Sequence, residues 1–129
     1  MRVLALDFGA ARTGVAVSDA TGTIAQPLEV VERAASRDGL ARVAEIVRQQ
    51  DVERVVVGLP LTLGGQRGIQ ALETEEFVRE LRQALDVPVE TYDERFTTTL
   101  AARDAGTAPE DARAAAHLLE SYLARVGSR

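Results

Sequence analysis

The sequence predicts an α/β fold built on a mixed five-stranded sheet, in which an antiparallel three-strand meander joins two parallel strands and helices flank the sheet. Three observations carry this prediction. Short aliphatic and β-branched runs follow one another closely at residues 2–7, 14–18 and 24–32. From Ser36 onward, apolar residues recur at the spacing of an amphipathic helix. A run at 52–58 with Val55-Val56-Val57 at its centre then has the character of a strand that is buried on both faces, as in a parallel sheet.

The connections in the first half fit this order. Residues 8–13 form a hairpin-sized loop in which Gly9 can adopt a positive φ, and a second turn is predicted at 19–22. Ser36 is a good N-cap residue for the helix that follows it. The apolar positions of that helix are Leu40, Val43, Ala44 and Val47.

The second half alternates between the two kinds of element. After the run at 52–58, the pattern predicts a glycine-rich loop at 59–68, a helix at about 69–85 and a strand at 87–92. Helical segments follow at about 97–104 and 109–126. This order is typical of α/β proteins. No repeat, linker or composition shift divides the chain, so we expect one domain over residues 1–129.

Composition excludes several classes of protein. The chain has 129 residues with 15 basic and 20 acidic side chains, all the basic ones are arginine, and there is no cysteine. A disulfide framework, a zinc–thiolate site and a thiol nucleophile are therefore excluded. No apolar run approaches the roughly 18–20 residues of a membrane span, and the apolar start is too short for a signal peptide. We therefore expect a cytoplasmic protein with no membrane partner.

Acidic residues stand where predicted strands end. Asp7 closes the first strand, and Asp93 and Glu94 follow the last one. Because the first, fourth and fifth strands are expected to run parallel, their carboxyl ends should share one edge of the sheet, where open α/β sheets place their sites. Asp111 lies in the first turn of the final helix, on the same stripe as Ala115 and other residues expected to pack on the sheet.

Converging carboxylates need a cation, since a buried charge without a partner is costly. Oxygen ligands without cysteine favour Mg²⁺ or Mn²⁺, and one or two such ions would suit phosphodiester hydrolysis. Each acid alone has a simpler explanation. Asp111 could interact favourably with the helix dipole, and Asp93-Glu94 could be a polar turn. Asp7 is harder to dismiss because Asp is depleted from strands, and it is the joint placement that favours a metal site.

Other candidate residues have weaker support. His117 shares a helix stripe with Arg113 and Glu120, so we expect it to be solvated. The run 73–76 reads as the solvated start of a helix. The glycines at 64–68 are not a Walker A loop, because no Gly-Lys-Ser/Thr ending follows and the chain has no lysine.

Taken together, these segments resemble the YqgF family, also called RuvX, of RNase H-like nucleases related to Holliday junction resolvases. The resemblance covers the whole chain in order. The matching stretches are Leu-Asp-Phe-Gly at 6–9, Arg-Thr-Gly-Val-Ala-Val-Ser at 12–18, Val-Val-Gly-Leu-Pro-Leu at 56–61, Asp-Glu-Arg-Phe-Thr-Thr at 93–98, and Asp111 with the segment 114–123. The resemblance implies an RNase H-like sheet and a metal-binding catalytic set of Asp7, Glu94 and Asp111, with Asp93 as an alternative metal ligand to Glu94.

By the same resemblance we expect a cytoplasmic endonuclease that processes the 5′ end of pre-16S rRNA, or a junction resolvase acting on branched DNA. Its partner would be structured RNA or branched DNA, and the chain could be a monomer or a homodimer. Arg12, Arg67 and Arg95 flank the expected site and are candidates for phosphate contacts. Two rivals of other classes remain: an ATP-binding phosphotransfer module, for which the chain is short, and a non-catalytic RNA-binding domain.

The net charge of −5 bears on the nucleic-acid partner. Residues 1–70 contain 8 arginines and 8 acids, whereas residues 71–129 contain 7 arginines and 12 acids. The acidic excess therefore lies in the half that holds Asp93, Glu94 and Asp111. Two divalent ions would neutralise all but one of these excess charges, so the acidic balance predicts weak, metal-dependent binding to nucleic acid.

Overall fold

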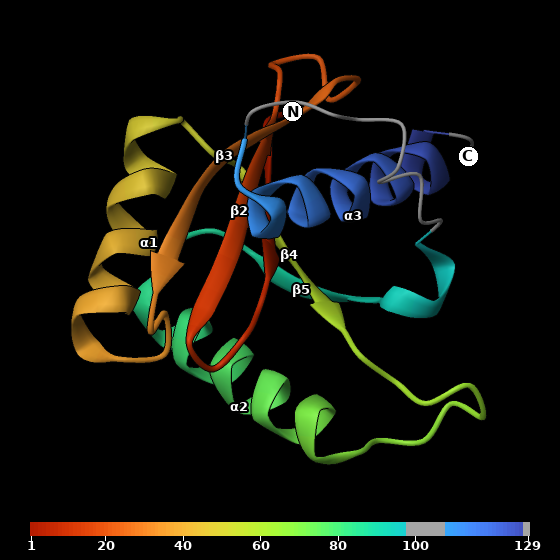
Figure 1. The fold of residues 1–129 in the computed structure, drawn as a ribbon. Coiled ribbons are helices and arrows are strands. Elements are labelled where there is room, and N and C mark those ends of the chain that lie inside the picture. Colours follow the sequence, from red (N-terminus) through yellow and green to blue (C-terminus); the bar gives the residue numbers. More distant parts are fainter. Residues whose placement is uncertain (98–107, 128–129) are drawn as a thin grey trace.

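Five strands form one mixed sheet in the order β3-β2-β1-β4-β5 in the computed structural model (Figure 1). The strands are β1 (Val3–Asp7), β2 (Arg12–Ser18), β3 (Ala25–Glu32), β4 (Arg54–Leu59) and β5 (Val89–Asp93). β1, β2 and β3 pair antiparallel, whereas β4 runs parallel to β1 and to β5. The predicted meander and the two added parallel strands are thus confirmed. β2 begins at Arg12, so the first loop is shorter than expected.

The structure describes residues 1–97 and 108–127, and the α-helices in these ranges match the predicted pattern. They are α1 (Arg37–Gln49), α2 (Ile69–Ala84) and α3 (Glu110–Gly127). A short 3₁₀ helix, η1 (Glu94–Phe96), follows β5 and was not predicted. Ser36 caps α1 as expected, since its hydroxyl accepts a hydrogen bond from the backbone N–H of Gly39. The helical segment predicted at 97–104 lies, beyond residue 97, outside the described residues.

The helices cover the two faces of the sheet, α1 and α2 on one and α3 on the other (Figure 1). Alternate residues of β1 divide accordingly. Leu4 and Leu6 pack with Val43 of α1 and Phe77 of α2, whereas Ala5 faces the α3 side. Apolar burial on both faces explains why β1 and β4 read as continuous apolar runs. None of the helices in the described ranges has the length and apolar composition needed to cross a membrane.

The pairing register brings four strand positions into line at the edge where the candidate acids were expected. Asp93 at the end of β5 pairs with Leu59 of β4, and Asp7 at the end of β1 pairs with Gly14 of β2. The start of α3 crosses this edge directly over Gly14, because a Cβ built there would lie 1.8 Å from the carbonyl oxygen of Asp111. The sheet and α3 therefore bring Asp7, residues 93–94 and Asp111 to the same edge of the sheet.

Candidate active site

Asp7 and Glu94 form a hydrogen-bonded carboxyl pair at this edge. Burial, followed by the charge of Asp7, raises the pKa of Glu94 to about 7. Burial also raises the pKa of Asp7, and the nearby charge of Asp111 adds to that rise, although the hydrogen bond with Glu94 opposes it. Protonated Glu94 therefore donates to the Asp7 carboxylate, and the pair shares a proton that a cation would displace.

Gly58 of β4 leaves room for the Glu94 side chain. A Cβ at this position would lie 2.5 Å from Oε1 of Glu94 and 2.9 Å from its Cγ. The Glu94 side chain thus lies directly against the backbone of β4 on its way to Asp7. Sequence reasoning missed this role for Gly58, which was recognised only as part of a family motif.

Asp111 reaches the same edge but is engaged by an arginine. Its Oδ2 lies 3.2 Å from Nε of Arg12, and its side chain is 37% exposed. Asp111 raises the pKa of Asp7 by its charge, so the two are electrostatically linked without a direct bond. Across residues 1–97 and 108–127, no three carboxylate or imidazole groups meet closely enough to hold a metal ion as they stand. Three-carboxylate coordination would need Asp111 to turn away from Arg12.

The neighbouring acids 93 and 94 point to different partners. The Asp93 carboxylate accepts hydrogen bonds from the backbone N–H and the guanidinium of Arg95, which lower its pKa. It also serves as the N-cap of η1. Arg95 in turn donates to the carbonyl oxygen of Leu63, so it ties the loop 60–68 to this edge. At the 3₁₀ turn Asp93 therefore has a structural role, as the cap of η1 and the partner of Arg95, whereas the Glu94 side chain points toward Asp7.

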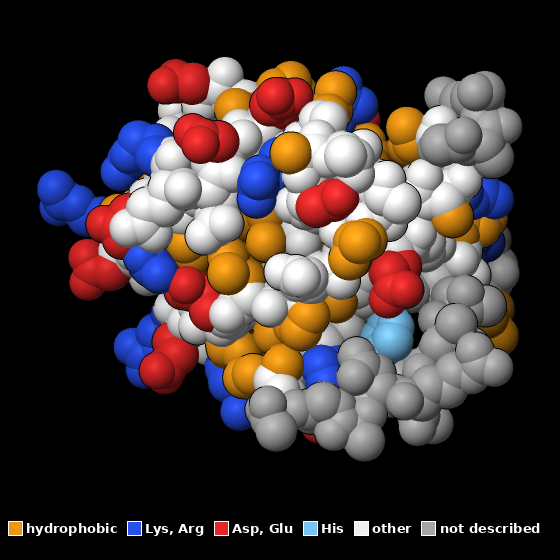
Figure 2. Space-filling model, turned by 90° about the horizontal axis from the view of Figure 1, so that it is seen from above, with side chains coloured by type: hydrophobic (Ala, Val, Ile, Leu, Met, Phe, Trp, Pro, Cys, Tyr) orange, Lys and Arg blue, Asp and Glu red, His pale blue; other side chains and the backbone are white. Residues whose placement is uncertain are grey.

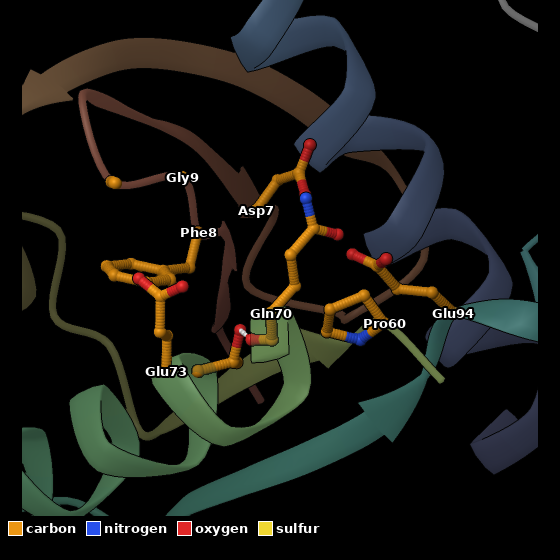
Figure 3. A pocket seen from close by; sticks show the side chains of 9 residues that line it. Asp7, Phe8, Gly9, Pro60, Gln70, Glu73 and Glu94 are labelled. Atoms are coloured by element: carbon orange, nitrogen blue, oxygen red, sulfur yellow. Dashed lines mark hydrogen bonds between the residues drawn. The ribbon is translucent and has the colours of Figure 1, made fainter. Parts of the chain in front are cut away.

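Two hollows meet at the carboxyl pair. The first, of about 250 Å³, runs from Asp7 and Glu94 along the loop after β1 to α2; its remaining lining residues are Phe8, Gly9, Ala10, Pro60, Gln70, Glu73 and Thr74. Figure 3 shows Gln70 and Glu73 rising from α2 into this cleft. The second, of about 240 Å³, lies on the α3 side against Thr97, Ala114 and Leu118. Among the described residues, the pair therefore borders a hollow on each side.

One expectation about a polar residue is confirmed and one is wrong. Glu73 is exposed in the first part of α2, as expected, and it also lines the cleft beside Asp7. His117 was expected to be solvated, but its side chain is only 12% exposed and its Nε2 is buried. The reason is that α3 buries a wide arc, including Ala112, Ala116 and Leu119 as well as the predicted stripe.

The three candidate phosphate-binding arginines are each paired with an acid: Arg12 with Asp111, Arg95 with Asp93, and Arg67 with Glu75 at 3.3 Å. The Arg12 and Arg67 side chains are well exposed, and exposed pairs contribute only about 0–1 kcal/mol, so they can be exchanged for phosphate. Figure 2 shows acidic and basic side chains interspersed on the face seen from above, with no broad basic surface among the described residues of that face.

Comparison with known proteins identifies the family. The RuvX family model, described as Holliday junction resolvase, matches residues 1–125. A protein of Desulforudis audaxviator (strain MP104C) named "Putative pre-16S rRNA nuclease" is 45% identical, and the match covers 95% of this chain and 94% of the relative. A Chloroflexus aurantiacus protein (strain ATCC 29366 / DSM 635 / J-10-fl) of the same name is 42% identical over 94% of this chain and 85% of its own length.

A solved structure shows the same fold. T. thermophilus RuvC in complex with Holliday junction substrate matches with a TM-score of 0.63 at 22% identity, covering 99% of this chain and 97% of that one. At this identity the likeness speaks for the fold, which is RNase H-like as the sequence motifs imply. Family, relatives and fold agree along the length of the chain, which belongs to the RuvX family of Holliday junction resolvase-like nucleases.

Proposed function

We propose that the chain is a divalent-metal-dependent endonuclease whose reaction centre is the Asp7–Glu94 pair together with Asp111. As a member of a nuclease family it is a hydrolase of phosphodiester bonds. The observation that carries the proposed site is the half-buried carboxyl pair at the carboxyl ends of β1 and β5, with raised pKa values and a third acid within electrostatic reach. Strongly perturbed carboxyl groups in a cleft are typical of catalytic sites.

The donor set fits a hard divalent cation. Asp7, Glu94 and Asp111 offer only carboxylate oxygens, the ligands that Mg²⁺ and Mn²⁺ prefer, and these residues would hold one or two ions. When bound, such an ion supplies the Lewis acid that activates a water and stabilises the leaving oxygen. Asp93 is the weaker candidate ligand, because both of its carboxylate oxygens accept from Arg95.

The chain's own residues supply positioning and charge. Arg12 leaves Asp111 to contact a substrate phosphate, which frees the carboxylate to turn toward Asp7. Arg95 holds the loop 60–68 through the carbonyl oxygen of Leu63. Arg95 and Arg67 can also donate hydrogen bonds to phosphates along one strand of the substrate. Guanidinium groups suit this task because they contact phosphate oxygens with two parallel hydrogen bonds.

We propose structured RNA at the 5′ end of pre-16S rRNA as the substrate, and hence the cytoplasm as the site of action. The names of the relatives that match nearly the whole chain support this choice. Branched DNA is the second candidate, supported by the family description and by the fold shared with RuvC. Oligomeric state does not enter either proposal.

The test is cleavage of structured RNA, duplex RNA and a four-way DNA junction, each with EDTA, Mg²⁺ or Mn²⁺. Divalent-dependent cleavage is expected, and Asp7→Asn should reduce it by at least about 100-fold, since it removes a charge from the reaction centre. Asp86→Asn is the matched control, because Asp86 is exposed and adjoins the hollow at the opposite edge of the sheet. Full activity of Asp7→Asn would refute the carboxylate proposal. ATP binding would favour the phosphotransfer rival, and RNA binding without cleavage the non-catalytic one.

A further inference from the structure

The cleft between the loop after β1 and α2 holds two polar side chains that the reaction centre does not use. Gln70 and Glu73 both line it, one turn apart on α2, and both are exposed to it (Figure 3). Neither side chain hydrogen-bonds or forms an ion pair with another of the residues in 1–97 and 108–127. Their hydrogen-bonding capacity is therefore available to a ligand that enters the cleft.

The rest of the cleft wall is already fixed. The Phe8 ring stacks on Phe77 of the core, with ring centroids 4.3 Å apart. The Thr74 hydroxyl donates to the backbone carbonyl oxygen of Gln70 at 2.8 Å, so its proton is not available to a ligand. The wall thus combines a rigid apolar surface with the free amide of Gln70 and the free carboxylate of Glu73.

The charges of the residues that line this cleft decide which chemical groups it can bind. Among the described residues that line it, the charged ones are Asp7, Glu73 and Glu94, and none is an arginine. A phosphate next to Glu73 would meet uncompensated repulsion, so backbone phosphates belong near Arg12 and Arg95, neither of which lines the cleft. An ionised carboxylate can only accept hydrogen bonds, so Glu73 needs a donor. In a nucleotide flanking a cleaved phosphate, the donor that separates RNA from DNA is the ribose 2′-hydroxyl.

We propose that Glu73 accepts a hydrogen bond from the 2′-hydroxyl of the nucleotide beside the cleaved phosphate, and that this contact makes the site prefer RNA to DNA. The inference rests on the proposed nuclease function and assigns its substrate class. A cleft of about 250 Å³ is smaller than the roughly 300–1,000 Å³ of sites for whole small molecules, as suits one unit of a polymer. Gln70, which both donates and accepts, binds the same nucleotide at a neighbouring polar atom.

The size of the expected preference follows from the chemistry of the contact. A hydroxyl bonded to a carboxylate is a charge-assisted hydrogen bond, and such bonds correspond to roughly 10- to 100-fold in an equilibrium or rate. Because Glu73 is exposed to solvent, the lower end applies, and we expect about tenfold. Glu73→Ala removes the acceptor, whereas Glu73→Gln keeps a neutral one and should lose less.

The experiment compares kcat/KM for an RNA substrate and for the same RNA carrying one 2′-deoxynucleotide, placed in turn on each side of the cleaved bond. For the wild-type protein, one placement should lower kcat/KM about tenfold. For Glu73→Ala the same placement should have no effect, while Glu73→Gln lies between. Glu76→Ala is the matched control, because Glu76 lies on the same helix outside the cleft, in an exposed ion pair with Arg79; it should behave like the wild type.

The outcomes separate this inference from the proposed function. Cleavage of RNA and its deoxy-substituted form at equal rates overturns the role of Glu73 and leaves the nuclease function standing. A deoxy effect that persists in Glu73→Ala, or efficient cleavage of branched DNA alone, overturns it as well. Failure of the wild-type protein to cleave any nucleic acid with Mg²⁺ or Mn²⁺ removes the proposed function and the inference together.

Discussion

Gly58→Ala is the sharpest perturbation of the carboxyl pair that leaves the pair itself unchanged. The added Cβ would lie 2.5 Å from Oε1 of Glu94, 2.9 Å from Cγ and 3.1 Å from Cδ. These three are the nearest atoms, and all belong to the Glu94 side chain. Ordinary van der Waals contact begins near 3.4 Å, so Oε1 must withdraw by about 1 Å.

The expected cost falls on activity more than on stability. A displacement of about 1 Å at a reacting group can lower the rate roughly 100-fold, which corresponds to about 2.7 kcal/mol of activation free energy. Folding should change by less than about 1 kcal/mol, because a side chain yields more easily than backbone and alanine is favoured over glycine within a strand. A large loss in kcat with a nearly unchanged melting temperature is therefore the signature of misplacement.

The assay is single-turnover cleavage of structured RNA with saturating Mn²⁺, together with thermal unfolding of the same samples. Gly64→Ala is the matched control, because a Cβ there would lie 4.0 Å from Oγ1 of Thr62, in ordinary contact, and it should keep wild-type activity. A folded Gly58→Ala protein with full activity would refute the reasoning that Glu94 must lie against β4. Equal losses in both variants would point to a general effect of the substitution.

Two further perturbations test the same edge of the sheet. Gly14→Ala places a Cβ 1.8 Å from the backbone carbonyl oxygen of Asp111. We expect it to lower the free energy of unfolding by about 1–3 kcal/mol, because the overpacked methyl group pushes α3 away from β2. Urea unfolding measures this change, and an unchanged midpoint would contradict the packing. Because the pKa of Glu94 is raised to about 7, its contribution to stability is complete below its ordinary value near 4.5 and is lost as pH rises through 7. Metal-free protein should therefore unfold more easily at pH 8 than at pH 5.5, by about 1–2 kcal/mol after discounting for its partial exposure, and Glu94→Gln should lack this part of the pH dependence. Mn²⁺ should restore stability at pH 8, and a wild-type-like pH profile in Glu94→Gln would show that another group is responsible.

The sequence was sufficient for the sheet and for the edge at which its acids gather. Apolar periodicity is local, and parallel strands necessarily bring their carboxyl ends together, so the sequence alone assigns Asp7 and residues 93–94 to one edge. The same reasoning located Asp111 at the start of α3. What it could not provide was the direction of each side chain at that edge.

Direction depends on contacts between residues distant in the sequence. Asp93 and Glu94 are adjacent and chemically similar, yet at the 3₁₀ turn the Asp93 carboxylate accepts from Arg95 whereas the Glu94 side chain hydrogen-bonds with Asp7. Glu73 could not be told from its solvated neighbours, because its place in the cleft depends on how α2 packs beside the loop after β1. The environment of His117 likewise depends on how wide an arc α3 buries, which a single stripe does not reveal.

The positions of the acidic and basic side chains around the carboxyl pair also bear on how a substrate binds. Outside the cleft, Arg12 at the start of β2 and Arg95 after β5 offer guanidinium groups that only exposed or local acids now occupy. The cleft toward α2, by contrast, is lined by acids, and none of the described residues that line it is an arginine. A substrate strand lying across the pair would therefore place its phosphates near these arginines and hydrogen-bond donors in the acidic cleft. Because the cleft and its surroundings favour opposite chemistries, they orient the substrate in a way that uniform basic charge would not impose.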